Sequence, residues 1–460
     1  MGSHARVVVA GTSGDSGKTL VSLGLTAAWR KAGRKVAVFK KGPDYIDAAW
    51  LGWAAGQDAH NLDVHLMGED TVRRNLAWYG RDADLVLIEG NRGLFDGVDA
   101  AGSASTARLA ALLEAPVVLV LSASKMTATA AAIVKGCQAF DPSLRIGGVI
   151  LNRVASERHG RIAAEAIEAS CAVPVLGLLP RLDDNLLPSR HLGLIPPTER
   201  GNCEALHARL AEIVAAHVDL DKVEALARSA PPLPVVQPSP VASPSVRVGY
   251  FRDSAFTFYY PENLEALERA GATLEPISAL ESQRLPSLDL LYIGGGFPEA
   301  HAARLSANRP LCAAVHGAAA AGLPIYAECG GLMYLARAVH TDGQSYPMSD
   351  VLPIEIEIMP RPQGHGYCEV AVAAKNPFFP VGTVMRGHEF HYSRVIRAAD
   401  RVAFAYRVNR GTGCGLASDG QPRDGMMAGN VLASYTHLHA DGVAGWADNL
   451  CRCARANRPT

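Results

Sequence analysis

Short apolar runs alternate with amphipathic helical patterns along most of the chain. The runs occupy residues 6–10, 35–39, 85–89, 116–121, 147–151, 173–176, 246–251, 288–293 and 324–327. Because they lack the polar alternation of a half-exposed strand, they indicate strands that are buried on both faces. Buried strands separated by helices predict parallel, doubly wound sheets, so we expect an α/β fold in both halves of the chain.

One proline-rich stretch, residues 227–245, interrupts this pattern. Its composition can neither continue a helix nor lie inside a sheet, because proline lacks the amide hydrogen that both require. We therefore predict an interdomain linker at residues 227–245, a first domain at residues 1–226 and a second domain at residues 246–460. A chain of 460 residues fits two domains of ordinary size.

The composition narrows the classes of function. The 44 Lys and Arg residues nearly cancel the 45 Asp and Glu residues, so no net field draws the chain to nucleic acid or to an anionic membrane. No apolar run reaches the ~20 residues that a membrane span needs. The nine cysteines show no paired zinc-binding spacing, which favours reduced thiols. We expect a cytoplasmic protein that binds neither nucleic acid nor membranes and holds any anionic ligand at a local site.

A glycine-rich loop, residues 11–19, follows the first predicted strand and opens a helix. This is the context of a phosphate-binding loop, in which backbone amides around Gly14 and Gly17 surround the phosphates. Lys18 would add a positive charge, and the Thr19 hydroxyl would reach Mg²⁺. A glycine turn with an incidental Gly-Lys-Thr is the competing interpretation. The strand, loop and helix order favours ATP binding.

Acidic and amide side chains follow three other predicted strands of the first domain. Ligands of open α/β sheets collect at such strand ends, and a cation that bridges phosphates needs carboxylates nearby. Taken singly, an acidic residue at such a position is more often a helix cap or turn former than a ligand. A solvated lysine at a strand end explains Lys40 about equally well. Beside a phosphate loop, a role in ligand binding is favoured. The candidates are Lys40, Asp44, Asp47, Glu89, Asp96 and Asn152.

Residues 323–336 predict a strand, a sharp turn and a helix, with Cys329 at the turn and two glycines after it. The glycines permit a strained nucleophile elbow. We expect the thiol to be exposed at the helix N-terminus, where the helix dipole lowers a thiol pKa and backbone amides face a developing oxyanion. A buried apolar cysteine is the alternative.

A thiol nucleophile needs a base, and the best candidate is His437, at the end of an apolar run. His439 lies two residues further on, and an exchange of roles between the two histidines stays open. Residues 294–296, three glycines after a predicted strand, offer backbone amides for an oxyanion hole, or form only a turn.

Together these motifs resemble the cobyrinic acid a,c-diamide synthases and their relatives, which amidate acetate side chains of modified tetrapyrroles. The first half is also similar to dethiobiotin synthetase, and the second half to class I glutamine amidotransferases. The resemblance covers nearly the whole chain outside the linker. Its most specific segments are residues 41–47, 89–97, 190–194, 255–260, 327–331, 387–393 and 434–437.

The resemblance implies a ligase in which ATP phosphorylates a substrate carboxylate and ammonia from L-glutamine attacks the acyl phosphate. In these terms Cys329 forms a glutamyl thioester and His437 moves the protons. Asp44 and Asp96 serve the acyl phosphate step, and Asn152 contacts the nucleobase. The residues that serve ATP and Mg²⁺ in family terms are Lys18, Thr19, Asp47 and Glu89, and Lys40 would neutralise charge on the transferring phosphoryl group. We expect a homodimer.

Two departures from the family matter. His439 stands where many class I glutaminases have a glutamate, so we expect either a catalytic dyad or a substitute residue that orients the histidine. After Asp47 the chain reads Ala48-Ala-Trp-Leu51, which differs from the usual cobyrinic acid enzymes and keeps sirohaem or sirohydrochlorin open as the substrate. His388 and His391 either face the substrate or form a packed pair.

Three other functions share some of these sequence features. A partition-type ATPase with a deviant loop carries an extra lysine early in the motif, where this chain has Ser13 and Gly14. A binding module without catalysis would not need both Cys329 and His437. The larger cobyric acid synthase type shares both domains, but residues 42–47 favour the a,c-type.

Overall fold

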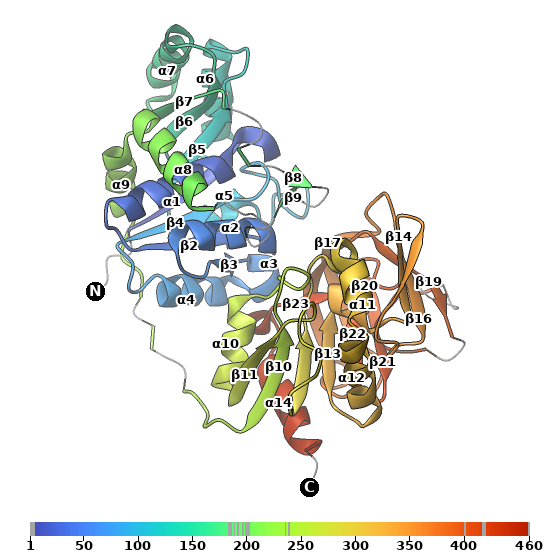
Figure 1. Ribbon diagram of the computed structural model, residues 1–460. Helices are drawn as coiled ribbons and strands as arrows, with labels where there is room; N and C mark the ends of the chain where they lie inside the picture. Colours follow the sequence, from blue (N-terminus) through green and yellow to red (C-terminus); the bar gives the residue numbers. More distant parts are fainter. Residues whose placement is uncertain are drawn as a thin grey trace. The chain divides into compact units, whose positions relative to one another are not determined.

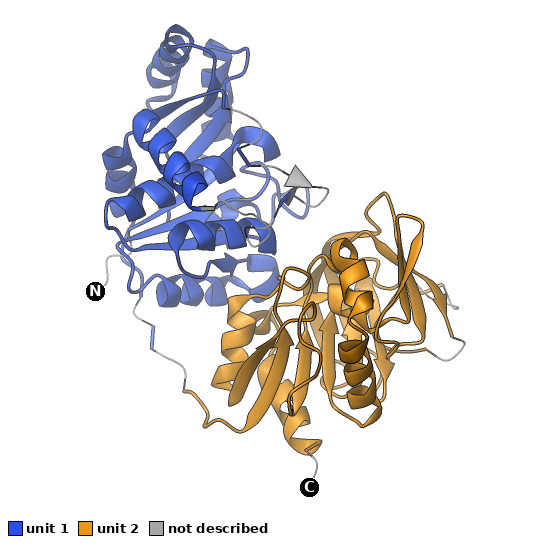
Figure 2. Cartoon of the chain, in the orientation of Figure 1, with its two compact units in different colours: residues 1–238 blue, residues 239–460 orange. Residues whose placement is uncertain are grey.

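The computed structural model describes residues 5–182, 186–187, 189–190, 193–195, 197, 203–234, 236–237, 240–399, 402–415 and 420–458. It divides the chain into two compact units, residues 1–238 and 239–460 (Figure 2). Among the described residues, no helix is long and apolar enough to cross a membrane.

Unit 1 is built on a seven-stranded sheet in the order β3-β2-β4-β1-β5-β6-β7, and all of its strand pairs are parallel (Figure 1). Strands β1, β2 and β4 are buried along their whole length, so both faces of the sheet are covered. The parallel α/β prediction is therefore confirmed. The strands are β1 Arg6–Gly11, β2 Val36–Lys41, β3 His60–Leu62, β4 Leu85–Glu89, β5 Val117–Ser122, β6 Ile146–Val154 and β7 Val175–Pro180.

Helices of unit 1 connect these strands and cover the sheet. They are α1 Lys18–Lys31, α2 Tyr45–Ala55, α3 Val64–Met67, α4 Glu69–Tyr79, α5 Thr106–Leu112, α6 Ala128–Phe140, α7 Glu157–Cys171, α8 Cys203–His217 and α9 Leu220–Arg228. A short hairpin, β8 Ser189–Arg190 and β9 Gly193–Leu194, precedes α8.

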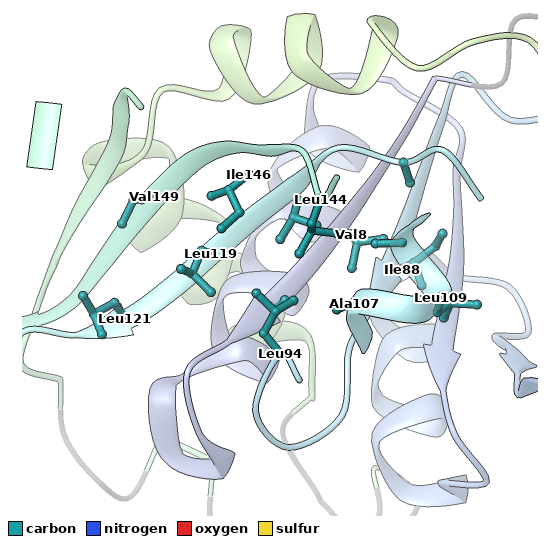
Figure 3. Packing of buried hydrophobic residues seen from close by; sticks show 14 of the residues in the cluster. Val8, Ile88, Leu94, Ala107, Leu109, Leu119, Leu121, Leu144, Ile146 and Val149 are labelled. Atoms are coloured by element: carbon teal, nitrogen blue, oxygen red, sulfur yellow. The ribbon is translucent and has the colours of Figure 1, made fainter. Parts of the chain in front are cut away.

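The core of unit 1 forms where the apolar strands meet the helices. Val8 of β1, Leu119 of β5 and Val149 of β6 pack in one cluster with Leu109 of α5 (Figure 3). These side chains are almost fully buried, and burying one such side chain stabilises a fold by about 1.5–3 kcal/mol. This rigid core fixes the strand ends at which the polar candidates lie.

The predicted linker begins on unit 1. Helix α9 extends to Arg228, and the buried Arg6 guanidinium donates a hydrogen bond of 2.6 Å to the carbonyl of Pro231. Leu233 packs against the core of the same unit. The domain boundaries themselves stay a prediction.

Unit 2 holds a ten-stranded mixed sheet in the order β11-β10-β12-β13-β22-β21-β20-β17-β18-β23. The pairs from β11 to β22 are parallel, and those from β22 to β23 are antiparallel. The strands are β10 Val246–Phe251, β11 Ala272–Ile277, β12 Leu290–Ile293, β13 Ile325–Glu328, β17 Gly364–Val372, β18 Val384–His391, β20 Ala403–Arg410, β21 Arg423–Ala428, β22 Val431–Ser434 and β23 His437–Leu438.

A second, four-stranded sheet and several helices complete unit 2. The sheet has the order β15-β14-β16-β19 and consists of β14 Ala338–Thr341, β15 Gln344–Pro347, β16 Ile354–Ile358 and β19 Ser393–Ala398. The helices are α10 Pro261–Arg269, α11 Ala302–Ala307, α12 Arg309–Ala320, α13 Gly330–Leu335 and α14 Trp446–Ala456. The second α/β unit is thus confirmed, with more antiparallel structure than the apolar runs predicted.

Candidate active sites

The glycine-rich loop leaves β1 at Gly11 and enters α1 at Lys18. Gly17 has φ 97°, a left-handed conformation that favours glycine, and a Cβ built there would lie 2.1 Å from the side-chain nitrogen of Asn152. Asn152, near the end of β6, stabilises the loop, because its Nδ2 donates a hydrogen bond of 3.0 Å to the Ser16 carbonyl. Its expected contact with the nucleobase stays a prediction.

Lys18 turns back over this loop. Its Nζ donates to the carbonyl oxygens of Ser13 at 2.9 Å and Gly14 at 3.3 Å, and the side chain is only 5% exposed. Burial lowers the pKa of Lys18, and the nearby charge of Lys40 lowers it further. The loop therefore concentrates one positive charge beside its backbone amides, an arrangement that suits a phosphate chain.

A buried cluster of charges lies at the ends of β2 and β4. The Lys40 Nζ lies 2.6 Å from Asp47 Oδ2 and 2.8 Å from Glu89 Oε1, and the lysine is 1% exposed. Burial alone would lower the pKa of Lys40, but the two carboxylates raise it above its usual value. The interpretation as a solvated lysine is therefore wrong, because the parallel pairing of β2 with β4 places Lys40 directly beside Glu89.

Thr19 and Glu89 join this cluster to the phosphate loop. The Thr19 hydroxyl donates to Glu89 Oε1 at 2.8 Å. Glu89 is fully buried, and its other oxygen, Oε2, has no hydrogen-bond partner among the described residues. An anionic oxygen without a partner is costly inside a protein, and together with a hydroxyl it provides the hard oxygen ligands that Mg²⁺ prefers.

Asp44 and Asp96 occupy two turns near the same strand ends. Asp44 caps α2, where its Oδ1 accepts hydrogen bonds of 2.9 Å from the amides of Ile46 and Asp47. Burial, and then the charge of Asp47, raise the pKa of Asp44 to about 7. Asp96 is exposed, and its Oδ2 accepts from the Gly93 amide at 2.8 Å.

The turn that carries Asp96 is attached to the phosphate loop. The Leu94 amide donates to the Gly11 carbonyl at 2.7 Å. A Cβ built on Gly93 would lie 3.1 Å from the Thr12 carbonyl. The residues predicted for nucleotide and acyl phosphate binding thus lie together at the carboxyl ends of the parallel strands.

One charged residue of this region was missed by sequence reasoning. Lys41 is 6% exposed; its backbone pairs with Leu62 of β3, but its side chain forms no hydrogen bond or ion pair with any residue that the structure describes. Burial lowers the pKa of Lys41, while the charges of Asp63 and Asp96 raise it and that of Arg92 lowers it. Successive strand residues point to opposite faces, so the pair Lys40-Lys41 at a strand end could have indicated two different environments.

The predicted nucleophile elbow is present in unit 2. Cys329 has φ 48° and ψ −95° between β13 and α13, and its amide donates to the Ser434 carbonyl at 2.7 Å. A non-glycine residue in this conformation is strained, and such strain is typical of functional turns.

The environment of the thiol differs from our expectation. Cys329 is 6% exposed, and burial raises the pKa of its thiol, an effect that the carboxylates of Glu299 and Glu328 increase. The prediction of an exposed thiol with a lowered pKa is therefore wrong. The helix that follows has only six residues, and the dipole of so short a helix does not offset the burial of the thiol.

The three glycines that end β12 lie against the elbow. A Cβ built on Gly330 would lie 3.2 Å from the Gly296 amide nitrogen. The loop is held by the segment before α10, because the Gly294 amide donates to the Tyr259 hydroxyl at 2.8 Å and the Phe258 amide to the Gly295 carbonyl at 3.0 Å. Fixed amides next to a nucleophile elbow are what an oxyanion hole requires.

Of the two candidate bases, His437 faces this glycine loop. A Cβ built on Gly295 would lie 2.7 Å from the Cε1 atom of His437. His439 is fully buried elsewhere, where its Nδ1 accepts from the Asp441 amide at 3.2 Å and its ring lies 4.6 Å from that of Tyr260. The geometry thus favours His437 as the base.

His388 and His391, the two histidines of the segment 387–393, form packed contacts. His388 stacks on His437 with a centroid distance of 4.8 Å, and burial, followed by the charges of His437 and His439, lowers the pKa of His388. His391 stacks on Tyr435 at 3.7 Å. These contacts favour the interpretation of packed histidines.

Two further parts of unit 1 bear on the family resemblance, namely Trp50 and the segment 190–194. Trp50, part of the departure after Asp47, is 1% exposed and donates its indole N–H to the Ile195 carbonyl at 3.0 Å. It therefore belongs to the core of unit 1. In the segment 190–194, His191 and Leu192 lie outside the described residues.

Comparison with known proteins gives matches to both halves. Residues 7–195 match the CobQ/CobB/MinD/ParA nucleotide binding domain, and residues 247–444 match the CobB/CobQ-like glutamine amidotransferase domain. A cobyrinate a,c-diamide synthase of Magnetococcus marinus is 42% identical over 455 residues, which cover 97% of this chain and 96% of that protein. Proteins of the same name from Syntrophotalea carbinolica (43% identical, 95% and 96% covered) and Archaeoglobus fulgidus (40% identical, 94% and 94% covered) are also similar.

Proposed function

This chain belongs to the cobyrinate a,c-diamide synthase family of glutamine-dependent ligases, and we propose that it amidates the a and c acetate carboxylates of cobyrinate. The observation that carries the proposal is the pair of strand-end sites in one chain. One site joins a phosphate loop to buried carboxylates, and the other joins a cysteine elbow to a histidine. The match of residues 7–195 to a nucleotide binding domain supports the part of the proposal in which unit 1 binds ATP.

In the proposed first half-reaction, a substrate carboxylate oxygen attacks the γ-phosphorus of ATP, the bond to ADP breaks and an acyl phosphate forms. A carboxylate is a poor electrophile, and phosphorylation turns one of its oxygens into a leaving group. The loop amides and Lys18 would balance the charge of the transferred phosphoryl group. Asp44 and Asp96 would position the acyl phosphate, and Lys41 with Arg92 would attract the substrate carboxylate.

Mg²⁺ belongs to the same proposal. The Thr19 hydroxyl, Glu89 Oε2 and Asp47 would hold the ion, which would neutralise phosphate charge. The unpaired Oε2 of Glu89 supports this assignment. A homodimer is proposed on the resemblance, and a cytoplasmic location on the unpaired cysteine pattern of the sequence.

In the second half-reaction, the Cys329 sulfur attacks the amide carbon of glutamine and expels ammonia. Burial keeps the thiol protonated, so His437 would accept its proton during the attack and pass it to the departing nitrogen. The amides near Gly296 would stabilise the oxyanion. Water then releases glutamate from the thioester, and the ammonia displaces phosphate from the acyl phosphate to give the amide.

The departure from the family after Asp47 is the reason to consider sirohaem and sirohydrochlorin as substrates. The burial of Trp50 in the core weakens this reason, since a core residue does not contact the ring. Cobyrinate is therefore the proposed substrate.

The test is direct amidation. The protein is incubated with ATP, Mg²⁺ and glutamine, and separately with cobyrinate, sirohydrochlorin or sirohaem. High-resolution mass spectrometry follows the small mass decrease that accompanies each change from carboxylate to amide. We expect two successive decreases with cobyrinate. Product from none of the three would refute the proposal, and product from another ring alone would reassign the substrate.

A further inference from the structure

We infer that Glu328, the residue before the nucleophile, positions His437 and takes the place of the glutamate that this chain lacks two residues after the histidine. This inference rests on the glutaminase function proposed for unit 2. Glu328 Oε2 lies 3.7 Å from His437 Nδ1, and the two side chains are 0% and 2% exposed. A carboxylate on one nitrogen of a buried imidazole leaves the other nitrogen for the thiol.

The Glu328 carboxylate is held rigidly by three donors from three strands. Its Oε1 accepts from the Tyr326 hydroxyl at 2.7 Å and from the Leu438 amide at 3.1 Å. Its Oε2 accepts from the Tyr292 hydroxyl at 3.2 Å. Donors aimed at both oxygens fix the orientation of the carboxylate. The Leu438 amide also fixes the carboxylate relative to the residue next to His437.

The fold explains why a residue so far away in sequence reaches the histidine. Strand β13 lies parallel to β22, with Glu328 paired to Ser434 at their ends. Beyond β22 the chain turns and continues as β23, which carries His437. Glu328 at the end of β13 thus approaches the Nδ1 side of the His437 ring, and the elbow residue Cys329 follows it directly in the chain.

The distance of 3.7 Å is longer than a hydrogen bond, and the pair is an ion pair only when the imidazole is protonated. In the proposed mechanism His437 becomes an imidazolium as it takes the thiol proton. A fixed carboxylate in a buried site stabilises that charge, and contacts of this kind tighten as the reaction proceeds.

His439, which occupies the position of the usual glutamate, has a carboxylate of its own. Its Nε2 lies 3.7 Å from Glu262 Oε2, and both side chains are fully buried. The described part of unit 2 therefore contains three buried glutamate–histidine pairs, with separations of 3.7 Å for Glu328 and His437, 3.7 Å for Glu262 and His439, and 3.9 Å for Glu389 and His391. Only the Glu328 pair includes the histidine that faces the glycine loop, so Glu262 provides a matched control.

The experiment compares Glu328→Gln with Glu262→Gln in the full-length protein. Glutamine hydrolysis is measured over a range of pH, and ammonia-driven synthesis is measured as a readout that needs no thiol. For Glu328→Gln we expect kcat to fall by about 100-fold or more, with KM for glutamine unchanged. The acidic limb of its kcat profile should move to lower pH, because the imidazolium has lost its counter-charge. Glu262→Gln should keep the wild-type profile, and both variants should keep ammonia-driven synthesis.

Glu328→Asp keeps the charge but withdraws the carboxylate from the ring. We expect an intermediate kcat, with the acidic limb closer to that of the wild type than in Glu328→Gln. A Glu328→Gln enzyme with wild-type kcat and profile would overturn the inference, as would equal losses in the Glu328 and Glu262 variants. If Glu328→Gln does not fold, a wild-type kcat for Glu328→Asp would overturn the inference instead. A wild-type protein that hydrolyses no glutamine would instead refute the proposed function.

Discussion

Both candidate sites are built at the same kind of connection, a buried strand that turns through a positive φ into a helix. In unit 1 the residue at the turn is Gly17, with φ 97°, and in unit 2 it is Cys329, with φ 48°. At the glycine no side chain fills the loop, so backbone amides line the site and can surround an anion. At the cysteine the strain is retained, and a side chain that carries a thiol stands at the turn.

The two sites also differ in the charges that they bury. Unit 1 encloses a network of ions, in which Lys40 bridges Asp47 and Glu89. Unit 2 keeps the Cys329 thiol neutral by burial, with a carboxylate held by tyrosine hydroxyls beneath it. The first arrangement suits a reaction between highly charged groups, and the second suits a neutral amide. The charges buried at each site thus agree with the reaction proposed for that unit.

The largest effect on the rates of synthesis and hydrolysis is expected when each site is disabled separately. Lys18→Met should lower both glutamine-driven and ammonia-driven synthesis by about 1,000-fold or more and leave glutamine hydrolysis intact. Cys329→Ala should abolish hydrolysis and glutamine-driven synthesis but keep synthesis from ammonia. Product and glutamate formation are measured for each variant. Loss of ammonia-driven synthesis in Cys329→Ala would show that the cysteine is misassigned.

Gly17→Ala tests the backbone-lined turn. The new Cβ meets Asn152 in a left-handed conformation, so we expect loss of ATP binding and a destabilisation of about 1–3 kcal/mol. Gly14→Ala is the matched control for stability, because no atom lies within 4 Å of its added Cβ. Calorimetry and urea denaturation measure the two effects. Equal stability of the two variants would argue against strain at Gly17.

Asp44 provides a pH-dependent test of charge burial in unit 1. Its pKa of about 7 in the folded protein lies above the value of about 4 for an unfolded chain, so folding binds a proton. The stability from this proton is fully present below pH ~4 and is lost as the pH rises to ~7. Asp44→Asn cannot titrate and keeps the capping oxygen. We expect the wild type to lose stability relative to this variant across that range, as measured by urea denaturation, whereas parallel curves would contradict the raised pKa.

The smallest effect concerns the strain at the elbow. Cys329→Gly should be more stable than Cys329→Ala by about 1 kcal/mol, because glycine adopts a positive φ without strain. Both variants lack the thiol, so thermal unfolding isolates the backbone term. If the alanine variant is equally stable, the elbow is not strained and the contrast with Gly17 disappears.

Much of the parallel framework was predictable because buried strands have a strong local signature. Strand β4, for example, was predicted at its observed bounds, while β7 lies at residues 175–180 rather than 173–176. The antiparallel strands of unit 2, such as β17, β18 and β20, were not predicted. Half-exposed strands carry shorter and weaker apolar patterns, and their pairing depends on partners far away in the sequence.

The sequence by itself determined the two α/β units, the phosphate loop, the elbow at Cys329 and the candidate residues around them, because each depends on a short, contiguous pattern. Tertiary structure alone decided the burial of the thiol, the burial of Lys41 and the approach of Glu328 to His437. Burial and charge depend on residues brought together from distant segments. Glu328 and His437 are separated by more than a hundred residues, and only the pairing of β13 with β22 brings them together.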